Sequence, residues 1–161
     1  MRTQPSRIWS IVRAARACRV TARDRVRTFG LIRSASDGTW PLEHRPEVVS
    51  VARKITRTTL GSWRIGAAGA EAVVLVVSEL VTNALEHAQP PMALHLEHEH
   101  AGLWVWVGVS DGGPAESDSA RTVSCANDEH GRGLPVIDAL SADHGTHIIH
   151  SGVIHWAWLW T

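Results

Sequence analysis

Two segments in the first half of the chain carry hydrophobic residues at helical spacing. In residues 46–60, apolar side chains recur every three or four positions, which predicts an amphipathic helix. Residues 70–88 then run for nineteen positions without glycine or proline. Their valine-rich stretch favours a strand by propensity, but nineteen residues exceed an ordinary strand and make about five helical turns. We therefore expect a second, buried helix over residues 70–88.

The period of the pattern changes from about 3.6 to 2 after the two prolines at 90–91. Four later segments alternate side chains in the manner of strands, and glycine-containing turns divide them into two pairs. We expect two antiparallel hairpins, residues 92–97 with 103–109 around Ala101-Gly102, and residues 146–150 with 153–160 around Ser151-Gly152.

Three further segments complete the expected order of elements. Residues 40–42 suit a short extended piece, and residues 133–140 suit a short helix. Residues 112–130 hold almost no large apolar side chain, which is typical of a functional lid or a disordered loop. The order helix, helix, strand pair, lid, helix, strand pair predicts an α+β fold. We expect a two-layer sandwich with a mostly antiparallel sheet and helices on one face.

Charge divides the chain into two parts. Residues 1–36 contain nine arginines and one acidic residue, whereas residues 37–161 contain seven Lys/Arg and fifteen Asp/Glu. We expect a basic, flexible N-terminal extension over 1–36 and one globular domain over 37–161. A basic extension is suited to nucleic acid, an anionic membrane or an acidic partner. The alternative to such a binding role is a poorly ordered extension, or a start codon assigned too far upstream.

Length and composition exclude several classes of protein. A chain of 161 residues that is 44% hydrophobic builds one sizeable core. It lacks a run of about 18 to 20 apolar residues and an apolar secretory signal. Its two cysteines do not make a disulfide framework. We expect a cytoplasmic protein with reduced thiols and no membrane span.

Glu79 and Asn83 stand four residues apart on the long predicted helix, and His87 continues the same face. At this spacing the first two side chains project about 6 Å from each other. An asparagine oxygen suits a magnesium ion that keeps several waters, and a glutamate takes a proton from an attacking group. The polar edge of an ordinary packed helix is the alternative.

Asp111 ends the second strand of the first hairpin, in phase with the three valines before it. The pleat therefore aims its carboxylate at the helix side of the sheet. A carboxylate placed there needs a donor, and the exocyclic amine of adenine is a suitable one. Gly112 and Gly113 let a ring come close. An Asp-Gly-Gly-Pro turn explains the same residues.

Gly131-Arg132-Gly133 precedes the start of the short predicted helix. Backbone N–H groups at such a place bind phosphate oxygens with help from the helix dipole. A flexible hinge is the alternative. Neither a P-loop nor a Rossmann glycine motif is present in the chain.

Three of these segments, in this order, resemble the sequence boxes of one ATPase superfamily. They are SELVTNALEHA (78–88), VSDGGP (109–114) and HGRGL (130–134), which resemble the N box and the two glycine boxes of the GHKL ATPases. The resemblance runs from about Trp40 to Trp158. The short single-domain form is similar to the anti-sigma-factor serine/threonine kinases and their actinobacterial ATP-binding relatives. It implies the histidine-kinase-like ATPase fold.

The resemblance also implies a role for each matching residue. Glu79 is the general base, which activates a serine hydroxyl of a protein substrate or a water, and Asn83 ligates magnesium. Asp111 binds the adenine amine, with Gly113 giving the ring room. The remaining implied nucleotide contacts are His87, His130, Gly131, Arg132, Gly133 and Leu134.

Two positions depart from the pattern of these relatives. Ala115 stands where the first glycine box usually has its second glycine, and Val153 follows Gly152 where a basic residue is common. We expect both changes to impair phosphoryl transfer more than nucleotide binding.

The implied function is an ATP- and magnesium-dependent serine/threonine protein kinase. It would phosphorylate a small anti-sigma-factor antagonist protein and sequester a sigma factor. ATP hydrolysis that drives a conformational switch is one alternative, and a nucleotide-binding interaction module without turnover is another. We expect no direct nucleic acid binding by the body of the chain.

Two other residue groups invite a function. A cluster of acids and histidines over residues 95–100 looks like a metal site, but alternation divides its members between two sheet faces. Trp104 and Trp106 are predicted on the sheet face away from the helices, and Trp156, Trp158 and Trp160 share one face of the final strand. We expect some of these five tryptophans to be core residues. An uncovered face of this kind is a candidate surface for a homodimer or another partner.

Overall fold

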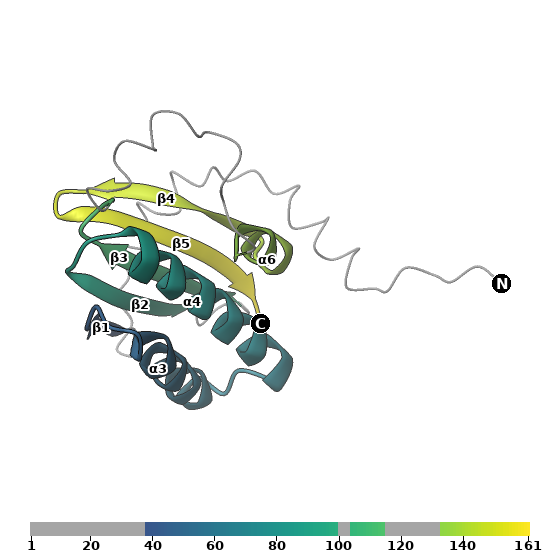
Figure 1. The fold of residues 1–161 in the computed structure, drawn as a ribbon. Helices are drawn as coiled ribbons and strands as arrows, with labels where there is room; N and C mark the ends of the chain where they lie inside the picture. Colours follow the sequence, from purple (N-terminus) through teal and green to yellow (C-terminus); the bar gives the residue numbers. More distant parts are fainter. Residues whose placement is uncertain (1–37, 100–103, 115–132) are drawn as a thin grey trace. The chain divides into compact units, whose positions relative to one another are not determined.

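An antiparallel sheet with helices on one face forms the fold. The computed structural model describes residues 38–99, 104–114 and 133–161. Within them the elements are β1 (Gly38–Leu42), α3 (Val48–Ser62), α4 (Ala67–His87), β2 (Met92–Glu99), β3 (Trp104–Asp111), α6 (Gly133–Leu140), β4 (Asp143–Ile149) and β5 (Gly152–Trp160). The strands follow the order β1-β2-β3-β5-β4 in one sheet, and the helices lie on one side of it (Figure 1). The predicted α+β architecture is confirmed.

Several predictions fall outside the described residues. They concern the basic extension over 1–36, the turn at 101–102, and the lid from Ala115 to residue 130. His130, Gly131 and Arg132 lie outside them as well.

Helix α4 is the central element of the core. Seven of its residues are buried at helical spacing: Val73, Val74, Val76, Val77, Leu80, Val81 and Ala84. This face packs on β3 and β5, so burial outweighs the strand preference of valine. Of the described helices, α4 is also the one long and apolar enough to cross a membrane by composition. Here its buried residues belong to the hydrophobic core.

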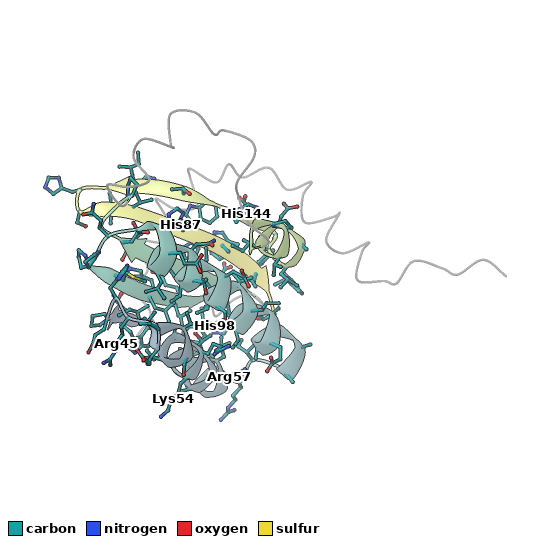
Figure 2. The ribbon with its side chains drawn as sticks, in the orientation of Figure 1. Arg45, Lys54, Arg57, His87, His98 and His144 are labelled. Carbon is teal, nitrogen blue, oxygen red and sulfur yellow. The ribbon has the colours of Figure 1, made fainter. Side chains whose placement is uncertain are left out.

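Helix α3 lies beside α4 and confirms the predicted amphipathic pattern. Its buried stripe consists of Val48, Ala52, Thr56 and Leu60. The Thr56 hydroxyl donates a hydrogen bond to the Ala52 carbonyl at 2.8 Å, which satisfies the polar group inside the core. Lys54 and Arg57 project from the other side of the helix, away from the sheet (Figure 2).

The sheet face toward the helices is apolar on its central strands. Leu94 pairs with Val109 between β2 and β3, and Val105 pairs with Leu159 between β3 and β5. All four side chains are fully buried. A shift of one residue in either pairing would turn this set outward, so the core fixes the register. The pairings β2–β3 and β4–β5 confirm both predicted hairpins.

Trp104 and Trp106 lie on the sheet face away from the helices, as predicted, and the pairing of β3 with β5 puts Trp156, Trp158 and Trp160 on the same face. Trp106 pairs with Trp158, and Trp104 pairs with Trp160. The Trp104 ring meets Trp158 and Trp160 edge-on, with ring centroids 6.3 and 4.7 Å apart. Trp156 and Trp158 are only 6% and 3% exposed, whereas Trp160 is 50% exposed. In the described residues, this face is therefore not a broad uncovered tryptophan surface.

The acid and histidine cluster divides between the two sheet faces. His95 lies opposite Gly108 on the tryptophan face, whereas His98 lies opposite Val105 on the helix face. The His98 ring stacks on Trp63 at a centroid distance of 5.2 Å. Across residues 38–99, 104–114 and 133–161, no three His, Cys, Asp or Glu side chains are placed to hold one metal ion.

Two leucines on α4 test the assignment of its faces. Leu80 is 5% exposed and Leu75 is 44% exposed. Leu80→Ala should lower the free energy of unfolding by about 2–5 kcal/mol, because it leaves a cavity against the sheet. Leu75→Ala should change it by less than about 1 kcal/mol. Urea denaturation measures the free energy of unfolding of each variant. Equal losses in the two variants would show that the assignment of the buried and exposed faces of α4 is wrong.

Candidate functional site

The candidate site is built around Asp111, the last residue of β3. Its side chain points inward, as predicted, and the residue is only 3% exposed. The backbone N–H of Gly113 donates a hydrogen bond to Oδ1 at 2.8 Å. The other oxygen, Oδ2, is buried and has no hydrogen bond in the described residues. Because a buried carboxylate oxygen without a donor is costly, this atom marks a place for a ligand donor.

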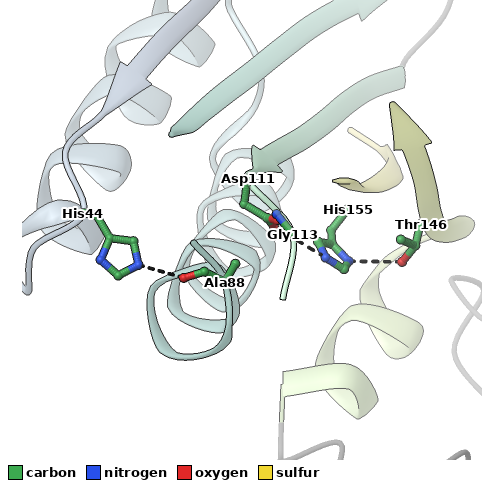
Figure 3. A network of polar contacts seen from close by, with 6 residues as sticks. All are labelled: His44, Ala88, Asp111, Gly113, Thr146 and His155. Carbon is green, nitrogen blue, oxygen red and sulfur yellow. Dashed lines mark hydrogen bonds and ion pairs between the residues drawn. The ribbon is translucent and has the colours of Figure 1, made fainter. Parts of the chain in front are cut away.

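Backbone hydrogen bonds tie the end of β3 to the segment that follows α4. The Gly112 N–H donates to the Gln89 carbonyl at 2.7 Å, and the Gln89 N–H donates to the Gly113 carbonyl at 2.8 Å. Nearby, His44 Nε2 contacts the Ala88 carbonyl at 3.1 Å (Figure 3). These contacts hold the Asp111 strand end next to the C-terminal end of the helix that carries Glu79 and Asn83.

Two glycines shape the backbone around Asp111. Gly113 has φ +89°, and among the described residues a Cβ atom there would meet no heavy atom within 4 Å. In this part of the chain, the space beside Gly113 is therefore open. Gly152 has φ +142°, and a Cβ atom there would collide with the Asp111 carbonyl oxygen. This glycine lets β5 start directly beside the strand end.

Glu79 and Asn83 share a face of α4 and are both partly buried. No hydrogen bond or ion pair engages either side chain within the described part of the chain. The Ser78 hydroxyl beside them donates to the Val74 carbonyl at 2.8 Å, so it is used by the helix itself. The pair is therefore available to a ligand, and the asparagine oxygen fits a hydrated magnesium ion.

His87 is more exposed than its two neighbours on the face. Its Nε2 lies 3.8 Å from Glu86 Oε2, and its side chain is 64% exposed. The structure thus places it at the rim of the candidate site, at the end of α4 (Figure 2).

Gly133 and Leu134 form the first turn of α6. This helix packs against α4, and its Ile137 is 1% exposed in the core. The Ser141 hydroxyl donates to the Ile137 carbonyl at 2.6 Å, which closes the end of the helix. Packing therefore brings the helix that begins at Gly133 against α4, the helix that carries Glu79 and Asn83.

His155 is a site residue that the sequence analysis missed. Its Nε2 lies 3.6 Å from Asp111 Oδ2, and its Nδ1 lies 3.1 Å from the Thr146 hydroxyl (Figure 3). Burial lowers the pKa of His155 below its usual value, and the nearby Asp111 carboxylate partly opposes this effect. Strand alternation could have placed His155 on the inner face, but only the pairing of β5 with β3 brings it to Asp111.

A surface depression of about 440 Å³ lies elsewhere, on the helix layer. It is lined by Arg53, Arg57, Ala68, Glu71, Ala72, Val74, Leu75, Ser78 and Leu140. None of the predicted site residues lines it. The buried Oδ2 atom of Asp111 and the pair Glu79 and Asn83, rather than this hollow, mark the candidate site.

A comparison with known protein families identifies the family of the chain. The chain matches a family model described as histidine kinase-like ATPase domain over residues 42–153, a range that includes Glu79, Asn83 and Asp111. No curated protein sequence matches the chain.

A solved structure shares the fold. The chain is similar to the crystal structure of the RsbU and RsbW domains of Rv1364c from Mycobacterium tuberculosis, with a TM-score of 0.59 and 17% sequence identity. The alignment covers 76% of this chain and 32% of that chain. At this identity the likeness shows the fold alone.

The lowered pKa of His155 gives a prediction for stability against pH. Because the folded-state pKa lies below 6.5, the unfolded chain binds more protons as the pH falls through this region. The free energy of unfolding of the wild-type chain therefore decreases as the pH falls below about 6.5. His155→Gln should lose less of this free energy over the same range, because glutamine has no imidazole to protonate. Urea unfolding at about pH 7.5 and about pH 5.5 measures the difference. An equal or steeper loss in the variant would contradict the assignment.

Proposed function

The chain belongs to the histidine kinase-like ATPase family, and from this premise we propose that it is an ATP-binding regulatory protein of the anti-sigma-factor serine/threonine kinase type. The observation that carries the proposal is the free, buried Oδ2 atom of Asp111. It lies at a strand end that is tied to the helix bearing Glu79 and Asn83. The sequence resemblance supports the finer assignment to the anti-sigma type.

Asp111 would recognise the base. An ionised carboxylate is an acceptor only, so it suits the exocyclic amine of adenine. Guanine presents a carbonyl oxygen at the corresponding position, and two acceptors facing each other in a buried site repel. The open space beside Gly113 supports a ring that approaches the strand end edge-on.

Asn83 and the second glycine box would hold the magnesium ion and the phosphates. Asn83 offers one neutral oxygen, which suits a magnesium ion that keeps waters and phosphate oxygens as its other ligands. Gly133 and Leu134 begin α6, where free backbone N–H groups favour phosphate oxygens. The magnesium ion would supply charge neutralisation, and His130, Gly131 and Arg132 stay predicted phosphate contacts.

Glu79 would act as the general base. In the proposed transfer, a serine hydroxyl of a protein substrate gives its proton to the Glu79 carboxylate. The serine oxygen forms a bond to the γ-phosphorus of ATP, and the bond to the leaving ADP breaks. Such transfer relies on positioning and charge neutralisation rather than on covalent chemistry by the protein.

The proposed partners are a sigma factor and a small antagonist protein that serves as the phosphate acceptor, and the proposed location is the cytoplasm. A homodimer is a further proposal. Two alternatives use the same site: an ATPase switch in which water takes the place of serine, and a binding module in which ATP orders a partner surface.

Asp111→Asn tests base recognition. The amide would turn a donor toward the adenine amine, so ATP affinity should fall roughly 10- to 100-fold, the value of a hydrogen bond to a charged group. The ratio of the affinity for ATP to the affinity for GTP should decrease as well. Calorimetric titration measures the affinity for each nucleotide, with Asp143→Asn at an exposed position as the matched control. Unchanged ATP affinity in Asp111→Asn would exclude this role.

Glu79→Gln separates binding from transfer. With γ-labelled ATP, magnesium and candidate antagonist proteins, the variant should still bind ATP but transfer label at least about 100-fold more slowly. Asn83→Ala should weaken magnesium-dependent ATP binding, and Glu86→Gln, an exposed change on the same helix, should behave as wild type. Label on the partner supports the kinase, and free phosphate alone indicates the ATPase. Binding without turnover in wild type indicates the module.

A further inference from the structure

His155 lies beside the base-recognition carboxylate and has no part in the proposed transfer. It stands opposite Val109 in the register between β5 and β3, so its ring lies on the inner face of the sheet. The ring bridges two strands, with Asp111 of β3 on one side and Thr146 of β4 on the other (Figure 3). Its side chain is 42% exposed, whereas that of Asp111 is 1% exposed.

The two neighbours of the ring select one tautomer. An ionised Asp111 carboxylate is an acceptor only, so the nitrogen that faces it is favoured to carry the hydrogen. Nε2 therefore carries the proton, and Nδ1 accepts the hydrogen bond that the Thr146 hydroxyl donates at 3.1 Å. Burial keeps the pKa of the ring low, so the ring is neutral near pH 7.

One oxygen of the Asp111 carboxylate is then hydrogen-bonded, and the other faces the His155 ring. The Gly113 N–H fixes Oδ1 at 2.8 Å, and the Nε2–H of His155 points toward Oδ2 from 3.6 Å. That separation is longer than a hydrogen bond. The ring therefore orients the carboxylate without occupying the oxygen, which stays open to another donor.

We infer that His155 is a positioning residue for base recognition, which orients the Asp111 carboxylate toward the 6-amino group of an adenine nucleotide. This inference rests on the proposed ATP-binding function and deepens it. Thr146 acts on Asp111 indirectly, because its hydroxyl donates to Nδ1 of His155 and so favours the tautomer with the proton on Nε2. Within the described residues, Asp111 is the charged group that contacts the ring.

The test compares ATP with purine riboside triphosphate, which lacks the 6-amino group. The wild-type chain should bind ATP more tightly than this analogue. His155→Phe keeps a ring but removes both nitrogens, and it should reduce that preference by roughly fivefold. His155→Gln keeps an amide donor near the position of Nε2 and should restore most of it. Thr146→Val, at an exposed position, should reduce the preference less. Calorimetry gives the four affinity ratios.

The outcomes distinguish this inference from the proposed function. If the wild-type chain binds neither nucleotide, the proposed function fails and the inference fails with it. If wild type prefers ATP and both His155→Phe and Thr146→Val keep the full preference, the inference alone is overturned. An equal loss of affinity for both nucleotides in His155→Phe, without recovery in His155→Gln, indicates a structural role and overturns it too.

Discussion

The packing of α4 against β3 and β5 is the constraint on which the rest of this structure depends. One side of the helix places its valines and Leu80 in the core, and this fixes the rotation of the helix about its axis. The same rotation decides where Glu79 and Asn83 point. Because the backbone after α4 is hydrogen-bonded to the strand end at Asp111, the core also sets the distance of Glu79 and Asn83 from Asp111. One helix therefore contributes both to the core and to the candidate site.

A second constraint is the desolvation of Asp111. A carboxylate that is 3% exposed, with one oxygen satisfied by a backbone N–H and the other without a hydrogen bond, is costly in an isolated domain. A donor from a ligand removes this cost. Gly152, which has no Cβ atom to collide with the Asp111 carbonyl oxygen, and the ring of His155 lie at the same corner of the sheet.

The sequence predicted most of the fold because the periods are strong. Helical spacing located α3 and α4, and alternation located both hairpins and the inward side chain of Asp111. Strand order is different, since it depends on which edges pair in three dimensions, and alternation within β5 does not reveal its neighbour. The contact of His155 with Asp111 was missed for this reason. Which tryptophans are buried was left open, because the neighbours of a ring on a sheet face cannot be read from spacing.

The central claim is that Glu79, Asn83 and Asp111 line one nucleotide site. Amide chemical-shift mapping of the wild-type chain during titration with magnesium and ATP tests it most directly. The account predicts that the largest shifts cluster at residues 79–83, 111–113 and 133–134, with little change at the exposed residues of α3. No shifts at millimolar ATP, or shifts confined to the tryptophan face of the sheet, would contradict it.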